Sequence, residues 1–137
     1  MFNFIGMKKS IKFLMILLAG VFSFTSCEEN ENNQEEDFSI IGRWHLVGFE
    51  QTVMYEFTPT QRHTIYSTNG VFGGLEEAIP NPNPWLIRND SIVIDLHFGN
   101  ALVAYPIFRC DGNAVDLVST TASQTLFREN YDLGLCD

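Results

Sequence analysis

Apolar and polar side chains alternate along much of the chain from about residue 38 onward. In residues 91–98, isoleucine, leucine and phenylalanine occupy every second position, while Asp95 and His97 lie between them. A repeat of two places the apolar set on one face of an extended chain, which is typical of a half-buried β-strand. The period predicts strands rather than helices, and only residues 75–79 look helical, over barely one turn.

About eight segments of this kind follow one another, separated by turn signals every 8 to 12 residues. The predicted strands are residues 42–50, 53–58, 62–67, 85–88, 91–98, 101–109, 114–118 and 125–129. Short turns such as Asn89-Asp90 and Gly99-Asn100 predict hairpins between neighbours. The chain is therefore predicted to be all-β, with an antiparallel meander that closes into a small barrel or folds into a sandwich. Closure is favoured because it removes exposed strand edges.

Bulky side chains predominate among the positions expected to face the interior. These candidates are Tyr55, Phe57, Tyr66, Ile92, Ile94, Leu96, Phe98 and Tyr105. Eight short strands enclose a space that side chains nearly fill or that holds one small ligand. Both a packed core and a lined cavity are therefore open interpretations.

The connection 68–84 interrupts the regular spacing. It contains Gly73-Gly74 and three prolines, yet it also carries Val71, Phe72, Leu75 and Ile79. A connection of this length within a small domain is usually functional or disordered. Its apolar side chains predict a flap over one mouth of the barrel.

Residues 1–26 read as an export signal. Lys8, Lys9 and Lys12 form a positive region, and a short apolar stretch follows over residues 13–24. About twelve apolar residues are too few to span a bilayer comfortably, so a permanent membrane helix is the weaker interpretation. Met7 is an alternative start to Met1.

The end of this segment resembles a bacterial lipoprotein signal. A short box, Phe24-Thr25-Ser26, precedes Cys27. The resemblance implies that Cys27 is acylated and becomes the new N-terminus, which anchors the protein to a lipid bilayer. Two acyl chains anchor stably where one binds only marginally. An ordinary secreted protein with an incidental cysteine is the alternative.

Residues 27–37 are expected to form a tether. After Cys27 this stretch contains no apolar side chain, and six of its residues are acidic. Such a segment cannot bury enough surface to fold. An acidic run after the lipidated cysteine also resembles the surface-export signal of some outer-membrane lipoproteins. We therefore expect an outer-membrane location, with display on the cell surface and a plain solvated spacer as equal alternatives.

Charge excludes one class of partner. From Cys27 onward, 17 acidic residues stand against five arginines, which gives a net charge of −12, and from Phe38 onward the net charge is −6. A surface this acidic repels a phosphate backbone, so no nucleic-acid partner is expected.

The three cysteines fit an exported protein. If Cys27 is acylated, Cys110 and Cys136 remain as an even pair in an oxidising compartment. A disulfide between them is expected, and two free thiols are the alternative.

The stretch Gly42-Arg43-Trp44 resembles the Gly-x-Trp start of lipocalin-like (calycin) barrels. The resemblance implies that Trp44 plugs the barrel floor after Gly42 begins the first strand. It also implies that Arg128, near the last strand, packs over the tryptophan ring as a cation–π pair. Among such proteins, the chain is most similar to small bacterial lipocalin-like lipoproteins, so a single barrel over residues 38–137 is expected.

Catalytic and metal-binding motifs are not evident in the sequence. His45, His63 and His97 are scattered over three predicted strands, without zinc spacing, and no Gly-x-Ser-x-Gly elbow is present. Glu76-Glu77 are adjacent loop residues, which is typical of solvated charge rather than an acid–base pair. We expect neither an enzyme nor a cofactor.

Two classes of function remain after these exclusions. The first is a barrel that binds a small apolar or amphipathic ligand, with Tyr55, Tyr66, Phe72, Leu75 and Trp85 as expected wall residues. The second is a filled barrel that acts as an interaction or inhibitor module for a protein partner. A chaperone-like carrier of other lipoproteins is a third, weaker idea. An open interior favours the first class, and a packed interior with an exposed apolar patch favours the second.

Overall fold

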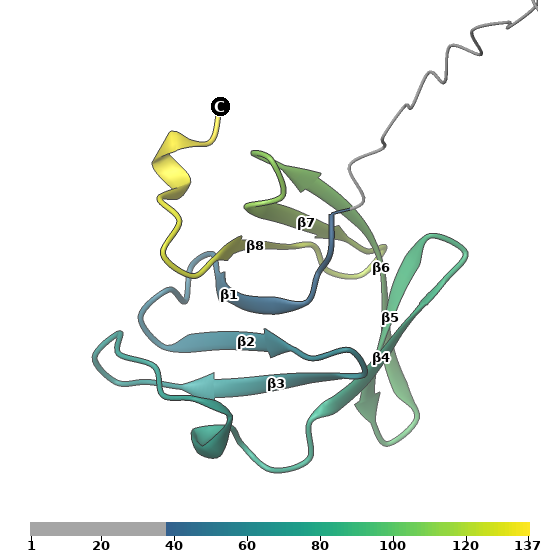
Figure 1. Cartoon of the computed structure of the whole chain (residues 1–137). Coiled ribbons are helices and arrows are strands. Elements are labelled where there is room, and N and C mark those ends of the chain that lie inside the picture. The colour runs from purple at the N-terminus through teal and green to yellow at the C-terminus, as the bar shows by residue number, and fades with distance from the viewer. Residues whose placement is uncertain (1–37) are drawn as a thin grey trace, which may run out of the picture. The chain divides into compact units, whose positions relative to one another are not determined.

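The two-residue repeat produces strands close to where the sequence predicts them. The computed structural model describes residues 38–137, and the predicted signal, Cys27 and the tether lie outside the described residues. Eight antiparallel strands follow in chain order around a closed barrel, which confirms the predicted all-β barrel (Figure 1). The strands are β1 (Gly42–Leu46), β2 (Val53–Phe57), β3 (Gln61–Tyr66), β4 (Asn83–Arg88), β5 (Ser91–His97), β6 (Asn100–Arg109), β7 (Ala114–Val118) and β8 (Gln124–Arg128).

Three expectations about strand ends and faces are wrong. β1 ends at Leu46 rather than at residue 50, because a turn begins at Val47 and Gly48 adopts a φ of 88°. Leu96 and Phe98 were expected inside but are 41% and 100% exposed, since a bulge shifts the register between Asp95 and His97. Tyr105 was also expected inside, but in β6 the buried residues are Leu102 and Ala104, which places Tyr105 on the opposite face.

The barrel is uneven around its circumference. β3 and β4 pair over two residue pairs only, Gln61 with Pro84 and Arg62 with Asn83. β6 pairs with β5 as far as Ala104 and with β7 from Tyr105 onward. β4, β5 and the first half of β6 therefore form a three-stranded wing that joins the rest of the barrel at its two edges.

Apolar side chains fill the interior. The largest of them, Trp44 and Phe57, are 0% and 1% exposed. The other buried members of this core are Ile40, Ile92, Ile94, Leu102, Ala104, Val115, Leu117 and Leu126. Leu46, Tyr55, Trp85 and Phe108 pack around it. An eight-stranded barrel with side chains of this size has a packed core.

A second, smaller apolar layer lies on the outside of the barrel. It consists of a row of directly paired residues across five strands, here called the outer row: Ala114, Phe127, His45, Met54 and Ile65. Met54, Ile65 and Ala114 are completely buried although they point away from the core. Outward-facing side chains are buried only when another part of the chain covers them.

The long connection after β3, predicted as a flap over the barrel mouth, supplies part of that cover. Phe72 packs edge-on against the outward-facing His45, with ring centroids 5.7 Å apart. Gly73 accepts a hydrogen bond from Arg43 Nη2 at 2.9 Å through its carbonyl oxygen. The connection contains a short 3₁₀ turn, Leu75–Glu77, and Ile79 N donates to Thr64 O on β3. Phe72 thus braces the outer wall, whereas Val71, Leu75 and Ile79 are exposed.

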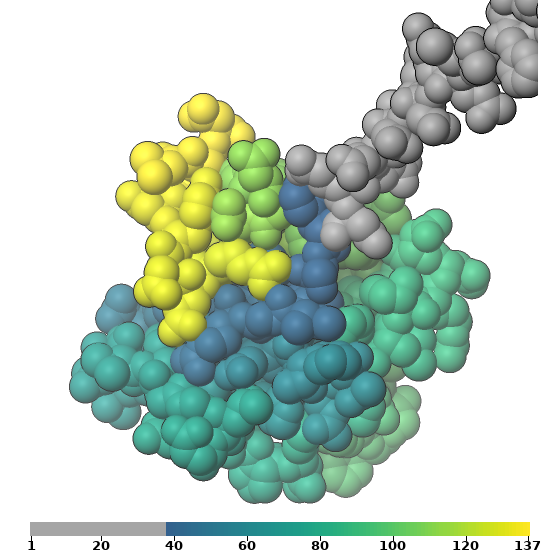
Figure 2. Space-filling view, in the orientation of Figure 1, coloured from purple at the N-terminus to yellow at the C-terminus, as the bar shows by residue number. Residues whose placement is uncertain are grey.

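The C-terminal segment is fastened to the same wall. Glu129 N donates to Arg43 O, and the Glu129 carboxylate forms an ion pair with Arg43 Nε at 2.8 Å. Arg43 also pairs with Glu56 on β2 at 3.2 Å. Figure 2 shows the C-terminal segment, in yellow, against the blue surface of β1. None of the helices in residues 38–137 is long and apolar enough to cross a membrane.

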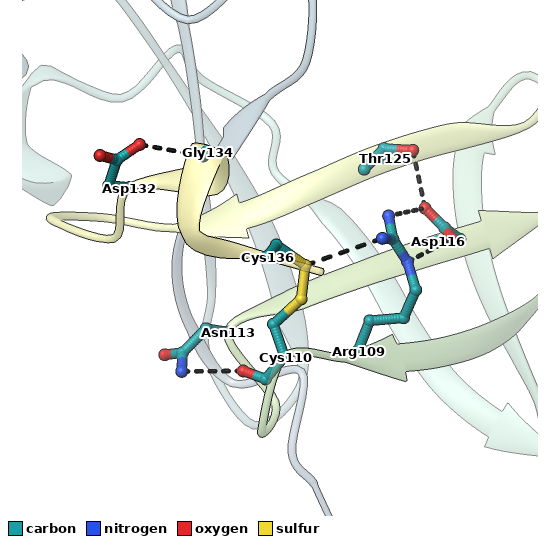
Figure 3. The surroundings of a disulfide bond; sticks show 8 residues. All are labelled: Arg109, Cys110, Asn113, Asp116, Thr125, Asp132, Gly134 and Cys136. Carbon is teal, nitrogen blue, oxygen red and sulfur yellow. Dashed lines mark hydrogen bonds and ion pairs between the residues drawn. A yellow bond between two sulfur atoms is a disulfide. The ribbon is translucent and has the colours of Figure 1, made fainter.

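Cys110 and Cys136 lie at disulfide-bonding distance, as expected (Figure 3). Their Cα atoms are 5.4 Å apart, within the range that a disulfide spans. Beside them Arg109 forms two hydrogen bonds with the Asp116 carboxylate, which also accepts one from Thr125 Oγ1. Burial raises the pKa of Asp116. The hydrogen bonds from Arg109 and Thr125 and the Arg109 charge lower it by more, so the pKa lies below its ordinary value. The Cys110–Cys136 pair joins the C-terminal segment to the β6–β7 turn.

Removing the disulfide should destabilise the barrel without unfolding it. The bond closes a loop of 26 residues, and the chain-entropy model assigns such a loop about 3 to 4 kcal/mol. We expect the Cys110→Ser/Cys136→Ser variant to lose about that much free energy of unfolding in urea titrations. Dithiothreitol should lower the stability of the wild type to that of the variant and leave the variant unchanged. Equal stability of both proteins under oxidising conditions would contradict the bond.

Candidate functional site

One end of the barrel is sealed. The Trp44 side chain is completely buried, and its Nε1 donates a hydrogen bond to Ile40 O at 2.7 Å. The guanidinium of Arg128 lies over the ring, with Cζ 3.9 Å from the centroid. Trp44 and Arg128 are directly paired between β1 and β8, so this contact joins the first and last strands. The contact that the lipocalin resemblance implies is therefore present.

Arg128 also holds the segment that enters β1. It donates hydrogen bonds of 2.6 Å to Ile41 O and Ser39 O. Burial lowers the pKa of Arg128 from its ordinary value, although an arginine remains charged at neutral pH. Gly42 adopts a φ of 122°, and a Cβ there would meet Arg128 Nη1. Only glycine fits this close approach, and we call this end of the barrel the sealed end.

The opposite end, called the open end here, lies where β1 and β3 finish and β2 and β8 begin. Two surface depressions of about 300 and 320 Å³ lie there. One is lined by Tyr66, Ser67, Thr68, Asn69, Val71 and Glu77, and the other by Leu46, Val47, Phe49, Ser123, Gln124 and Thr125. Leu46 lies two residues from Trp44 on β1, and Gln124 lies two residues from Leu126 on β8, so both side chains point to the same face as the core residues. The second depression therefore borders the barrel interior.

A charged side chain lies inside the barrel below the open end. Arg62 is 8% exposed and is paired on β3 with two neighbours, Phe57 and Asn83. Its Nη2 donates to Asn83 Oδ1 at 2.7 Å, and its Cζ lies 4.6 Å from the centre of the Tyr55 ring. Its Nε is buried and has no hydrogen-bond partner among residues 38–137. The guanidinium is thus only partly satisfied.

Polar groups surround this arginine. Burial lowers the pKa of Arg62, and the nearby Tyr55 and Tyr66 offset part of that shift. Thr64, on the same strand, is also buried, whereas Tyr66 at the end of the strand is 59% exposed. Across the barrel, Gln124 Oε1 is buried without a hydrogen-bond partner among the described residues. The open end therefore combines a buried cation with unused hydrogen-bonding capacity, unlike the apolar core beneath it.

The structure brings together only two of the five expected wall residues. Tyr55 and Tyr66 lie on one face of the β2–β3 pair, next to Arg62. Trp85 belongs to the core, where it packs edge-on against Phe57 and donates from Nε1 to Thr58 O. Phe72 covers the outside of the barrel, and Leu75 is exposed in the 3₁₀ turn. The expectation of one wall built from all five residues is wrong, because Phe72 packs on the outer face and Trp85 packs into the core.

Arg62 and Asn83 were missed in the sequence, although a signal for Arg62 exists. Residues 62, 64 and 66 share the parity that faces inward on β3. Reading that alternation strictly places an arginine inside the barrel. For Asn83 the sequence offers no comparable signal, since it lies among the prolines of the long connection.

Each of the three histidines lies beside a different part of the barrel. His45 lies between Phe72 and Phe127 in the outer layer, and His97 Nε2 is 3.1 Å from Asn81 O. His63 pairs with Glu56 across the β2–β3 ladder. Within residues 38–137, no group of three His, Cys, Asp or Glu residues is arranged to hold a metal ion.

Comparisons of the chain with protein-family models, curated proteins and solved structures found no match. We therefore argue the function from the two unlike ends of the barrel.

Removing the Arg128 guanidinium should destabilise the whole barrel. Arg128→Met keeps a long apolar side chain over Trp44 but loses the cation–π contact and both hydrogen bonds to the segment before β1. Because the site is partly exposed, we expect a loss of about 2 to 3 kcal/mol in urea unfolding. Arg88→Met is the matched control: Arg88 is exposed, so its replacement should change stability by less than about 0.5 kcal/mol. Equal losses in the two variants would show that Arg128 does not hold the sealed end.

Proposed function

We propose that this protein is a lipid-anchored lipocalin-like barrel of the cell envelope, and that it binds a small amphipathic ligand at the open end. The observation that carries the proposal is the contrast between the two ends. One end is closed by Trp44 and Arg128. At the other, Tyr66 lines one of two depressions, and Tyr55 and Arg62 lie on the same inward face of β2 and β3. Ligand sites combine apolar surface with a few convergent polar groups, which is the composition of the open end.

The packed core limits how deep such a ligand can lie. Ile94, Leu117 and Leu126 fill the space between the two ends and are almost completely buried. A ligand fully enclosed in the barrel, as a large carrier would hold it, does not fit this interior. The proposal is therefore a shallow site, in which Tyr66 at the rim contacts the apolar part of the ligand.

The anchoring part of the proposal rests on the sequence. The apolar stretch 13–24 ends at the box before Cys27, and all lysines precede it. An acylated Cys27 followed by the acidic tether would hold the barrel within reach of the membrane surface. A ligand taken up at that surface would be amphipathic, in agreement with the mixed character of the open end.

Lipidation is tested by replacing the cysteine. In cells fed an alkyne-labelled fatty acid, the wild-type protein should take up label and sediment with the outer membrane. The Cys27→Ser protein should take up none and leave the membrane fraction, because a single modified residue supplies the whole anchor. Cys136→Ser serves as the control and should still take up label. Label retained in Cys27→Ser would refute the lipoprotein assignment.

Ligand binding is tested with the neutral amphiphile dodecanol. The protein used is the Cys27→Ser form of residues 27–137, which keeps the entire barrel and carries no acyl chain. We expect dodecanol to displace the neutral fluorescent probe N-phenyl-1-naphthylamine. Tyr66→Ala should weaken dodecanol binding by about fivefold, because an exposed aromatic wall is lost.

Phe72→Ala is the matched control for this experiment. It removes an aromatic ring that packs outside the barrel on His45. We expect it to lower stability and leave dodecanol affinity unchanged. If neither probe nor dodecanol binds the wild type, the ligand-binding function is wrong.

A protein-interaction module is the second candidate, and the wing favours it. Leu86, Val93 and Val103 are directly paired across β4, β5 and β6 on the outer face. Leu86, Val103 and the neighbouring Tyr105 and Ile107 are each at least 44% exposed. Past Trp85, β4 pairs with β5 alone among the described strands. A partner strand that added to this edge would cover the apolar side chains.

A further inference from the structure

Arg62 lacks the counter-charge that a buried cation requires. Among residues 38–137 the ion pairs are formed by Arg43, with Glu56 and Glu129, and by Arg109, with Asp116. Arg62 has no carboxylate partner within this part of the chain, although the same part contains 11 acidic residues. The barrel therefore keeps a buried guanidinium without neutralising it.

Burying a cation is costly unless an anion or several hydrogen bonds compensate. The penalty amounts to several kcal/mol even after the surroundings relax. Arg62 receives one neutral acceptor, Asn83 Oδ1, and the face of one aromatic ring, Tyr55. Its Nε–H is left without an acceptor in the described residues. A planar guanidinium with free donors matches the two oxygens of a carboxylate or phosphate group.

Asn83 holds Arg62 in position instead of neutralising it. While Oδ1 of Asn83 accepts from Arg62, its Nδ2 donates to Asp95 O at 2.8 Å. This bridge fixes the guanidinium at the narrow β3–β4 junction, where only two residue pairs connect the strands. A site that is oriented before its ligand arrives loses little entropy on binding.

Arg128 shows what a structural arginine looks like in the same barrel. It lies over an aromatic ring as Arg62 does, but its guanidinium also donates to two backbone carbonyl oxygens at 2.6 Å. Its hydrogen bonds hold the chain together at the sealed end. Arg62 makes no comparable set of bonds, although it is the more buried of the two.

We propose that Arg62 is the anion-binding residue of the open end, and that the ligand is an amphiphile with a single negatively charged head group. This inference rests on the proposed ligand-binding function and names the chemical class of that ligand. The head group pairs with the free donors of Arg62, next to the phenol groups of Tyr55 and Tyr66. The apolar part lies outward, against Leu46 and Tyr66 at the rim, because the core beneath Arg62 is filled.

The acidic surface of the barrel restricts anion binding to the immediate surroundings of Arg62. The barrel carries a net charge of −6, and Glu77 lines the depression beside Tyr66. These charges disfavour anions in general, but at physiological ionic strength they are screened beyond about 8 Å. An anion therefore gains from binding only when its apolar part brings the head group to the buried guanidinium.

The test compares laurate with dodecanol, which has the same chain length and no charge. Both are titrated, below the micelle concentration, against the Cys27→Ser form of residues 27–137 loaded with N-phenyl-1-naphthylamine. We expect the wild type to bind laurate at least about tenfold more tightly than dodecanol. Arg62→Met should abolish this preference, so that laurate binds no more tightly than dodecanol. Arg62→Lys, which keeps the charge but loses the fork, should retain part of the preference.

The wild type decides the question even if Arg62→Met does not fold. Laurate that binds the wild type more tightly than dodecanol should also raise its melting temperature more at equal concentration. Equal affinities for both compounds would overturn the assignment of Arg62 and leave the ligand-binding function intact. A laurate preference that persists unchanged in folded Arg62→Met would also overturn it. Failure of both compounds to bind would overturn the ligand-binding function itself.

Discussion

The stacking of Arg128 on Trp44 is the interaction on which the barrel depends. Most of the strands have only five to seven residues, and one junction, between β3 and β4, contains just two residue pairs. Short strands close into a barrel only if the first and last ones are held together. Arg128 does this from β8, because it covers the tryptophan of β1 and binds two carbonyl groups of the segment that leads into that strand.

Sealing one end decides what the other end can do. With Trp44 and Phe57 in the core, the apolar interior is used for stability, and little is left to enclose a ligand. The inward positions near the open end are instead polar or amphipathic, as Arg62, Thr64 and Tyr66 show on β3. A buried cation at such a position weakens the fold unless an anion compensates. We interpret the free-energy cost of burying Arg62 as evidence that an anionic ligand binds there.

Much of the fold follows from local rules in the sequence, and most of the site does not. The alternation of side chains gives the eight strands, and cysteine pairing gives Cys110 with Cys136. Phe98 was misplaced because a bulge reverses the alternation, and a bulge has no strong sequence signal. Phe72 was misplaced because the path of a long connection depends on tertiary contacts such as that with His45. Arg62 could have been found from strand parity, but its lack of a counter-charge is a property of the folded barrel.

The most direct test of the account is to map laurate on the barrel by NMR. In ¹⁵N spectra of the Cys27→Ser form of residues 27–137, added laurate should shift the amide signals of Leu46, Thr64, Tyr66 and Gln124 at the open end. The signals of Trp44 and Arg128 should stay in place, because the sealed end excludes the ligand. Shifts confined to Leu86, Val93 and Val103 on the outer face of the wing would contradict a ligand site at the open end.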